Sequence, residues 1–323
     1  MREVLKYSLI VLAGIAILAG LWFRGGSKES TSDEGELSLR ELIGSPQPTD
    51  PALIGYDEII KLKVDLNSLR AIAVDQDDLI YVAGDSALVV LQDSGREVSR
   101  FVLGASAGCI AVSPEGRIYL GMKDHLRVLN KDGSEIGTWD KINSAAIITS
   151  IALTETEVFV ADAGNKIVWR YDTSGKLLSK IGERNGEEGK IGFVIPSPYF
   201  DVAIDRDGLL WVVNPGRHTL ENYTSDGQLR SSWERTSVGL DGFCGCCNPI
   251  HMALLPNGSF VTSEKGIARV KIHEPTGEFR TVVAAPELFA EGTVGLDLAV
   301  DAQERILVLD PKAGVVRIFV KKQ

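Results

Sequence analysis

Three of the chain's four cysteines lie close together, and a histidine follows soon after them. They occur in the stretch "DGFCGCCNPIHMALLPNG" as the pattern C-x-C-C-x3-H, formed by Cys244, Cys246, Cys247 and His251. Thiolate and imidazole ligands suit Cu(I), Zn or an Fe–S centre. The same thiols could instead form a Cys244–Cys247 staple or a strained vicinal Cys246–Cys247 bridge, or stay free and redox-active. The spacing matches neither a paired C-x2-C zinc signature nor the C-x-x-C-H haem motif. The metal site, the two disulfides and the free redox-active thiols therefore all stay open.

Few other polar side chains are candidates for binding or catalysis. In "NPGRHTLENY", Asn214, Arg217 and His218 could bind an anion or a carboxylate. The remaining histidines, His125 and His273, stand alone, and we expect them at the surface. Four histidines are too few for a His-rich zinc site. We find no Glu/Asn/Asp calcium constellation, no Ser-His-Asp set with motif support and no Gly-rich phosphate loop before a helix.

The elements that must position these residues come from an internal repeat. Each copy has a short apolar strand with a central alanine, a turn rich in Asp, Gly, Pro or Glu, and a second β-rich strand. The six copies are "AIAVDQDDLIYVAG" (71–84), "CIAVSPEGRIYLGM" (109–122), "SIALTETEVFVADA" (150–163), "DVAIDRDGLLWVVN" (201–214), "HMALLPNGSFVTSE" (251–264) and "DLAVDAQERILVLD" (297–310).

Five copies continue with a third strand, a Gly-containing turn and a fourth strand, which makes each unit a propeller blade. The sixth copy stops after its third strand, "VVRIFVKKQ", whereas an unassigned β-like run, "EIIKLKVD", precedes the first copy. Closing a ring removes bare sheet edges. The sequence therefore predicts an all-β fold, a six-bladed β-propeller over residues 57–323 that is closed by an N-terminal strand from Glu58 to Asp65.

The segment "VFVADAGNKIVWRYDTSGKLLSKIG", residues 158–182, resembles an NHL repeat almost throughout, and "ILVLDPKAGVVRIF" is close to the same pattern. Copies one, two and five depart from it at the Asp of "VAD". The resemblance to bacterial, membrane-anchored NHL-repeat six-bladed propellers implies the fold. It leaves the activity open, because such propellers include both binding scaffolds and enzymes.

The loops of the repeat fall into two sets on opposite faces. One set links the first strand to the second and the third to the fourth, and its loops are short and uniform, as tight hairpins require. We call the side on which they lie the hairpin face. The other set contains the long inserts 182–199 and 237–249, together with "NPGRHT" and "MKDH". We call this side the elaborated face, and loop elaboration on a rigid scaffold predicts binding there.

The residue two positions before each repeat alanine begins an innermost strand near the central channel. We call this ring the channel mouth, and its members in blade order are Ala71, Cys109, Ser150, Asp201, His251 and Asp297. Such polar groups could simply satisfy backbone groups and waters. Alternatively, Asp201, His251 and Asp297, on consecutive blades, form a ligand or metal site below the insert 237–249 that carries the three cysteines. The role of Cys109 stays open, since a buried lone thiol behaves as a small hydrophobe.

The first residues predict a membrane segment. Tyr7–Phe23 holds seventeen residues without a charge, near the lower limit for crossing a bilayer core of about 30 Å. Arg2 and Lys6 precede it, and no clear cleavage site or lipidation cysteine follows, so we interpret residues 1–24 as one uncleaved signal-anchor transmembrane helix. Nearby acids favour an N-inside orientation. The expectation is a single-pass protein of the cytoplasmic membrane with an extracytoplasmic propeller.

Residues 25–56 are rich in Gly, Ser, Pro and acids, which predicts a flexible linker. Net charge is −10 with no Lys/Arg block outside the termini, so nucleic acid is not an expected partner.

Three functions remain as hypotheses. The first is a membrane-anchored binding or scaffold module that recognises a protein or small-molecule ligand on the elaborated face. The second is a metal- or thiol-dependent redox protein using the four residues of the Cys/His pattern. The third is a lactonase-like hydrolase that would need calcium and Asp201 or Asp297.

Overall fold

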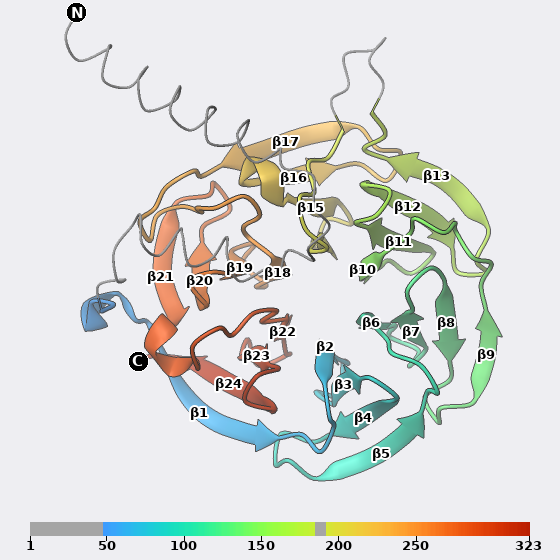
Figure 1. Cartoon of the computed structure of the whole chain (residues 1–323), viewed down its shortest axis with the longest axis horizontal. Coiled ribbons are helices and arrows are strands. Elements are labelled where there is room, and N and C mark those ends of the chain that lie inside the picture. The colour runs from blue at the N-terminus through green and yellow to red at the C-terminus, as the bar shows by residue number, and fades with distance from the viewer. Residues whose placement is uncertain (1–47, 185–191) are drawn as a thin grey trace, which may run out of the picture. The chain divides into compact units, whose positions relative to one another are not determined.

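The protein is described from a computed structural model, which covers residues 48–184 and 192–323. Over these ranges, six four-stranded sheets surround a common centre as the blades of a propeller (Figure 1). The predicted all-β, six-bladed architecture is confirmed. Blades 1 to 3 consist of β2 (Leu69–Val74), β3 (Ile80–Gly84), β4 (Ala87–Leu91) and β5 (Glu97–Val102); β6 (Cys109–Val112), β7 (Ile118–Gly121), β8 (Leu126–Leu129) and β9 (Glu135–Thr138); and β10 (Ile148–Leu153), β11 (Glu157–Asp162), β12 (Ile167–Asp172) and β13 (Leu177–Ile181).

The second half of the ring follows the same plan. Its blades 4 to 6 consist of β14 (Val202–Ile204), β15 (Leu210–Asn214), β16 (Thr219–Tyr223) and β17 (Leu229–Glu234); β18 (His251–Leu254), β19 (Phe260–Glu264), β20 (Arg269–His273) and β21 (Phe279–Ala284); and β22 (Leu298–Val300), β23 (Ile306–Asp310), β24 (Val315–Lys321) and β1 (Tyr56–Lys63). Short 3-10 turns are η1 (Pro51–Leu53), η2 (Pro215–Arg217) and η3 (Pro286–Leu288).

An aspartate sets the turn between the first two strands of several blades. Asp75 Oδ1 accepts hydrogen bonds from the backbone amides of Asp77 and Leu79, each at 2.9 Å. Asp205 and Asp301 make the same bonds in blades 4 and 6. Such a side chain replaces a backbone turn acceptor and fixes the reversal locally. The repeated Asp of the sequence is therefore a folding signal on the hairpin face.

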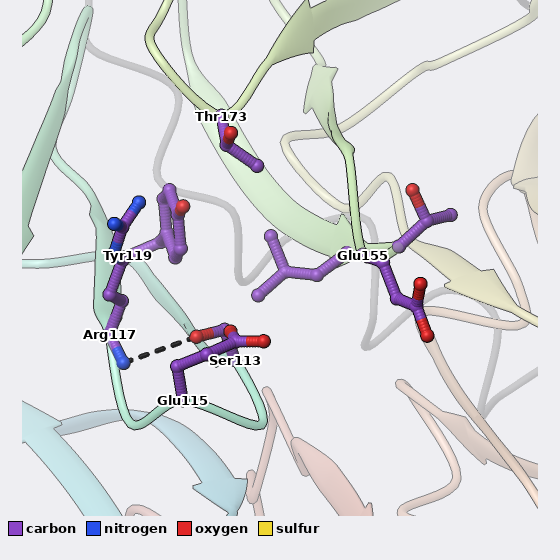
Figure 2. Close-up of a pocket in the computed structure, with 8 residues that line it drawn as sticks. Ser113, Glu115, Arg117, Tyr119, Glu155 and Thr173 are labelled. Atoms are coloured by element: carbon purple, nitrogen blue, oxygen red, sulfur yellow. Dashed lines mark hydrogen bonds between the residues drawn. The ribbon is translucent and has the colours of Figure 1, made fainter.

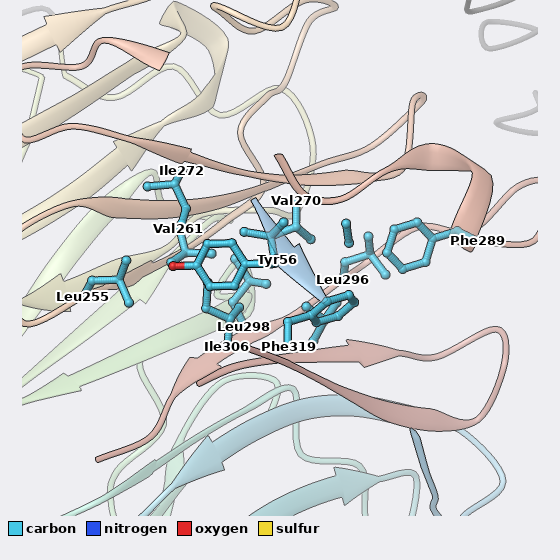
Figure 3. Packing of buried hydrophobic residues seen from close by; sticks show 13 residues of the cluster. Tyr56, Leu255, Val261, Val270, Ile272, Phe289, Leu296, Leu298, Ile306 and Phe319 are labelled. Carbon is cyan, nitrogen blue, oxygen red and sulfur yellow. The ribbon is translucent and has the colours of Figure 1, made fainter. Parts of the chain in front are cut away.

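The core lies between neighbouring blades rather than in one central cluster. The middle strands β3, β19 and β23 are buried along their whole length because other blades cover both of their faces. The outermost strand β5 alternates between exposed and half-buried residues. Figure 3 shows the cluster between blades 5 and 6, where Tyr56 of β1 lies among residues such as Val261 and Leu298.

The N-terminal strand completes the last blade, as predicted. β1 pairs antiparallel with β24, from Tyr56 opposite Lys321 to Lys63 opposite Val315. Blade 6 thus has the order β1-β24-β23-β22. The strand begins two residues earlier than its predicted start at Glu58, because Tyr56 packs into the apolar cluster between blades. Both ends of the described propeller therefore meet in one sheet.

The residues just before β1 also contact the propeller. The side chain of Asp50 accepts a hydrogen bond from Ala52 at the start of η1. Ile54 then forms a bridge with Val282 of β21. The end of the predicted linker therefore pairs with blade 5.

The predicted transmembrane helix lies outside the described residues. Among the residues that are described, no helix has the length and apolarity needed to span a membrane.

His273, expected at the surface, is fully buried. Its ring stacks on Trp233 at 5.4 Å between centroids and lies 5.0 Å from that of Phe243. Burial lowers the pKa of His273 to about 3, so the ring packs as a neutral aromatic group. The surface prediction was wrong because an isolated histidine in sequence can still occupy an inward-facing strand position.

Candidate functional site

Three polar residues of the channel mouth meet at the starts of consecutive innermost strands. His251 begins β18, while Asp201 and Asp297 immediately precede β14 and β22. The imidazole Nδ1 lies 3.7 Å from Asp201 Oδ2 and 3.4 Å from Asp297 Oδ1. The structure thus brings together the acid–imidazole–acid group that the repeat register indicated. The His251 side chain keeps an exposed fraction of 14%.

Both carboxylates also link neighbouring blades. Asp201 Oδ2 accepts a hydrogen bond of 2.6 Å from the amide of Met252 in blade 5. Asp297 Oδ2 accepts one of 2.8 Å from the amide of Ile72 in blade 1. Carboxylates that accept backbone N–H bonds are held in fixed positions. The two acids therefore join blades and, at the same time, present negative charge to the imidazole between them.

Ser150 and Cys109, two other members of the channel mouth, are buried. Ser150 Oγ lies 3.3 Å from the amide of Val202 and accepts its hydrogen bond, which joins blades 3 and 4. Cys109 is buried in blade 2. Burial raises the pKa of its thiol, and the charges of Asp297 and Asp201 raise it further. A thiol kept protonated in this way is a poor nucleophile and metal ligand.

The charges at the channel mouth shift each other's protonation. Burial lowers the pKa of His251, but the charges of Asp297 and Asp201 outweigh it, so the pKa stands above its ordinary value. Burial raises the pKa of Asp297, and the negative charge of Asp201 adds to this, against the opposing effect of His251. These opposing environments favour a protonated imidazole shared between two acids. Perturbed groups of this kind gather at functional sites more often than elsewhere.

All four cysteines carry unbonded thiols in this structure. The Sγ atoms of Cys246 and Cys247 lie 3.1 Å apart, with Cys246 exposed and Cys247 buried. Cys244 lies close enough to the charged side chains of blade 5 to be affected by them. Burial and the charge of Glu264 raise the pKa of its thiol. Within residues 48–184 and 192–323, no group of three or more His, Cys, Asp or Glu side chains is arranged to hold a metal ion.

Two side chains fix the cysteine loop, which we define as residues 237–249. Asn248 Nδ2 donates to the carbonyl oxygens of Cys244 at 2.8 Å and Lys265 at 3.1 Å, and its Oδ1 accepts from the Lys265 amide at 2.9 Å. His218 Nε2 lies 2.6 Å from the carbonyl oxygen of Gly245 and must be the donor there, since a carbonyl only accepts. The sequence indicated that His218 could bind an anion or a carboxylate, and in the structure its ring bonds the cysteine loop.

Buried charges of blade 5 hold the start of the same loop. Lys271 Nζ donates to the carbonyl oxygens of Leu240 at 3.1 Å and Gly242 at 2.5 Å, and lies 3.2 Å from Glu264 Oε2. Arg269 pairs with the same carboxylate. The lysine side chain has no exposed surface. Burial lowers the pKa of Lys271 to about 8, with the nearby charge of Glu264 opposing that effect.

Two residues next to the channel mouth, Tyr199 and Lys265, were not predicted from the sequence. The ring of Tyr199 meets that of His251 edge to face, with centroids 5.9 Å apart. Lys265 Nζ lies 5.4 Å above the Tyr199 ring. Lys265 belongs to the link between β19 and β20, on the elaborated face, where the loops of the sequence already predicted binding. Tyr199 ends the long insert, and no local pattern signals where its ring points.

The predicted residues of "NPGRHT" separate in the structure. Asn214 is fully buried, and its amide accepts from Val194 at 2.9 Å and donates to Glu221 at 2.8 Å. Both ends of this amide are thus bonded within the protein, so Asn214 fixes the preceding insert. Arg217 ends η2 and is half-buried.

Two cavities lie on the hairpin face, which we expected to carry little besides turns. A cavity of about 220 Å³ lies between turns of blades 2 and 3, where Figure 2 shows Arg117 and Tyr119 opposite Glu155. A larger one of about 390 Å³ lies among turns of blades 4 to 6, with Trp211 and Phe260 in its lining. Neither cavity includes a residue of the Cys/His pattern.

Comparisons with known proteins support the fold. No protein-family model matches the chain, and no curated protein matches it in sequence. Among solved structures, a streptogramin B lyase is similar with a TM-score of 0.60 and 11% identity, covering 84% of this chain and 100% of its own. Virginiamycin B lyase from Staphylococcus aureus is similar with a TM-score of 0.55 and 13% identity, covering 79% of this chain and 82% of its own. At these identities the similarity shows the propeller fold alone, and membership of the NHL-repeat family is not shown.

Proposed function

We propose that this protein is a membrane-anchored, extracytoplasmic binding propeller whose ligand is recognised at the channel mouth. The apolar run Tyr7–Phe23 supports the anchor, and the loops of the elaborated face support the side of recognition. Six rigid blades supply the scaffold.

The observation that carries the binding proposal is the placement of His251 between Asp201 and Asp297 from blades 4 and 6. Backbone bonds hold both acids in place before any ligand arrives. Two carboxylates outweigh one imidazole in either protonation state of the ring, so the group is negative whenever both acids are ionised. It therefore suits a ligand that carries a cationic group, such as an amine or guanidinium, on a small molecule or a protein.

The test uses the full chain with putrescine and arginine methyl ester as amine and guanidinium probes, measured by titration calorimetry. Asp297→Asn should weaken binding by about tenfold or more, because it removes one charge near the probe. His251→Gln should strengthen binding at pH 6, because it removes the competing imidazolium. Asp207→Asn on the hairpin face is the matched control and should leave binding unchanged. Binding of neither probe, or equal loss in Asp207→Asn, would contradict the proposal.

The anchor has its own test. The full chain should remain in the membrane fraction after a high-salt wash, and removal of residues 1–24 should release it. Added protease should degrade the propeller in spheroplasts without lysis. Protection of the propeller until lysis would place it on the cytoplasmic side and contradict the proposed orientation.

The lyase activity in the names of the two structural neighbours is not part of this proposal, because 11% and 13% identity carry no site residues across. The calcium-dependent hydrolase hypothesis has no support beyond the presence of Asp201 and Asp297. Both carboxylates are already bonded to backbone amides.

A further inference from the structure

Cys246 and Cys247 form a thiol pair with unequal access. Their Sγ atoms are 3.1 Å apart, which leaves a closure of roughly 1 Å to the length of a disulfide bond, about 2.05 Å. Cys246 is exposed, whereas Cys247 is buried with 1% of its surface accessible. A reagent from solvent therefore reaches Cys246 first.

A cation adjoins this pair. Burial lowers the pKa of Lys265, but a hydrogen bond to Cys247 and the negative charges that Cys247 and Cys246 carry as thiolates raise it above its ordinary value. The bonds of Asn248 to the Lys265 backbone hold this turn against the loop that carries both cysteines. A nearby ammonium stabilises a thiolate relative to the thiol. The short distance between the two Sγ atoms distinguishes this pair from Cys244 and Cys109, and Cys246 is the one exposed thiol among the four cysteines.

We infer that Cys246 and Cys247 are a redox-active dithiol that reduces a small-molecule disulfide and closes to a vicinal disulfide. The Cys246 thiolate attacks one sulfur of the substrate, forms a mixed disulfide and expels the first thiolate. Cys247 loses its proton to water, and its thiolate attacks Cys246 Sγ and expels the second thiolate. Two electrons pass from the pair to the substrate, giving one protein disulfide and two substrate thiols. This inference does not depend on ligand binding at the channel mouth.

The first step has a defined pH direction. Burial and the neighbouring Cys247 raise the pKa of Cys246, while the charge of Lys265 opposes them. Because the thiolate is the nucleophile, the reaction should accelerate as pH rises. Lys265→Met should slow it by about tenfold at a fixed pH below the thiol pKa, which corresponds to roughly one pKa unit lost with a neighbouring charge. Lys176→Met, at an exposed turn of blade 3, is the matched control and should leave the rate unchanged.

The experiment treats the reduced full chain with an aromatic disulfide that releases a coloured thiolate, in a Cys244→Ser background. The pair should release two equivalents, keep no adduct and lose two hydrogen atoms in mass, and peptide mapping should join Cys246 to Cys247. Cys247→Ser should stop at a stable adduct on Cys246 after one equivalent. Cys246→Ser should react at neither position, since Cys247 is buried. Thermal melting of each variant checks that it is folded.

A second probe tests whether the two thiols lie close enough to act together, without oxidising them. Phenylarsine oxide binds two adjacent thiols at once, so it should protect the pair from the aromatic disulfide in the parent protein and in neither single variant. The inference is overturned if the parent retains an adduct on Cys246. It is also overturned if, with Cys244 restored, oxidation joins Cys244 to Cys246 or to Cys247 instead.

Discussion

At the scale of single residues, the protonation of His251 depends on charges that the assembled blades bring close to it. The charges that raise its pKa come from Asp297 and Asp201, which lie far from it in sequence and on other blades. An unfolded chain separates these groups. The imidazole of His251 therefore binds a proton more tightly in the folded protein than in the unfolded chain, so folding and protonation are coupled.

The first prediction follows from that coupling. The folded pKa of His251 is raised, so its stabilising contribution is full below the unfolded value of about 6.5 and is lost as pH rises through the folded value. The stability difference between the parent and His251→Gln should therefore shrink as pH increases from about 6 toward 9. Urea denaturation of both proteins across this range measures it. A difference that stays constant or grows with pH would show that the imidazole is not held protonated.

At the scale of elements, the cysteine loop depends on buried charges of β19 and β20. Lys271→Met removes the donor to Leu240 and Gly242 and leaves Glu264 with one cation fewer. Breaking such a buried arrangement by removing one partner costs about 3 to 5 kcal/mol. Urea denaturation should show this loss, and hydrogen exchange should increase in residues 239–248. Lys123→Met, at an exposed position, is the control and should change stability by less than about 0.5 kcal/mol.

The Asp of the "VAD" segment in blade 3 leads to another prediction at this scale. Asp162 Oδ1 accepts from the amides of Ile147 at 2.9 Å and Gly164 at 3.0 Å, and its Oδ2 accepts from Trp169 Nε1 at 2.9 Å. Asp162→Ala leaves these donors without an acceptor, and each unsatisfied buried donor costs about 1 to 3 kcal/mol. We expect a loss of about 3 kcal/mol or more in chemical denaturation. Asp140→Ala, at an exposed position, should be near neutral; equal effects of the two changes would contradict this role.

Repeats made the elements predictable, while side-chain partners depended on long-range packing. The alanine register and the hairpin turns predict blades and place Asp201, His251 and Asp297 on one ring. The contacts of the His218 and His273 side chains could not be predicted from the alanine register or from the turns. The first bonds a loop that follows it by many residues, and the second is enclosed by aromatic rings of neighbouring strands. Lone polar residues carry no period, so sequence does not indicate which way they point.

At the scale of the whole molecule, the ring depends on β1 joining the C-terminal strands. Leu62 of β1 is buried, with 5% exposure, in a cluster that includes Leu309 and Val316. Ile59, on the same strand, has 48% exposure. Leu62→Ala should therefore cost about 3 kcal/mol, whereas Ile59→Ala should cost less than about 0.5 kcal/mol.

Urea denaturation followed by tryptophan fluorescence measures both variants, and the shape of the transition adds a second criterion. If β1 closes the ring, Leu62→Ala should lower the midpoint of one cooperative transition, because every blade packs against two others and a weakened seam is shared by all of them. If blade 6 instead separates early while the other blades persist, the transition should split into two steps. Equal small effects of Leu62→Ala and Ile59→Ala would mean that the N-terminal strand adds little to the ring, and the proposed closure would then fail as an account of its stability.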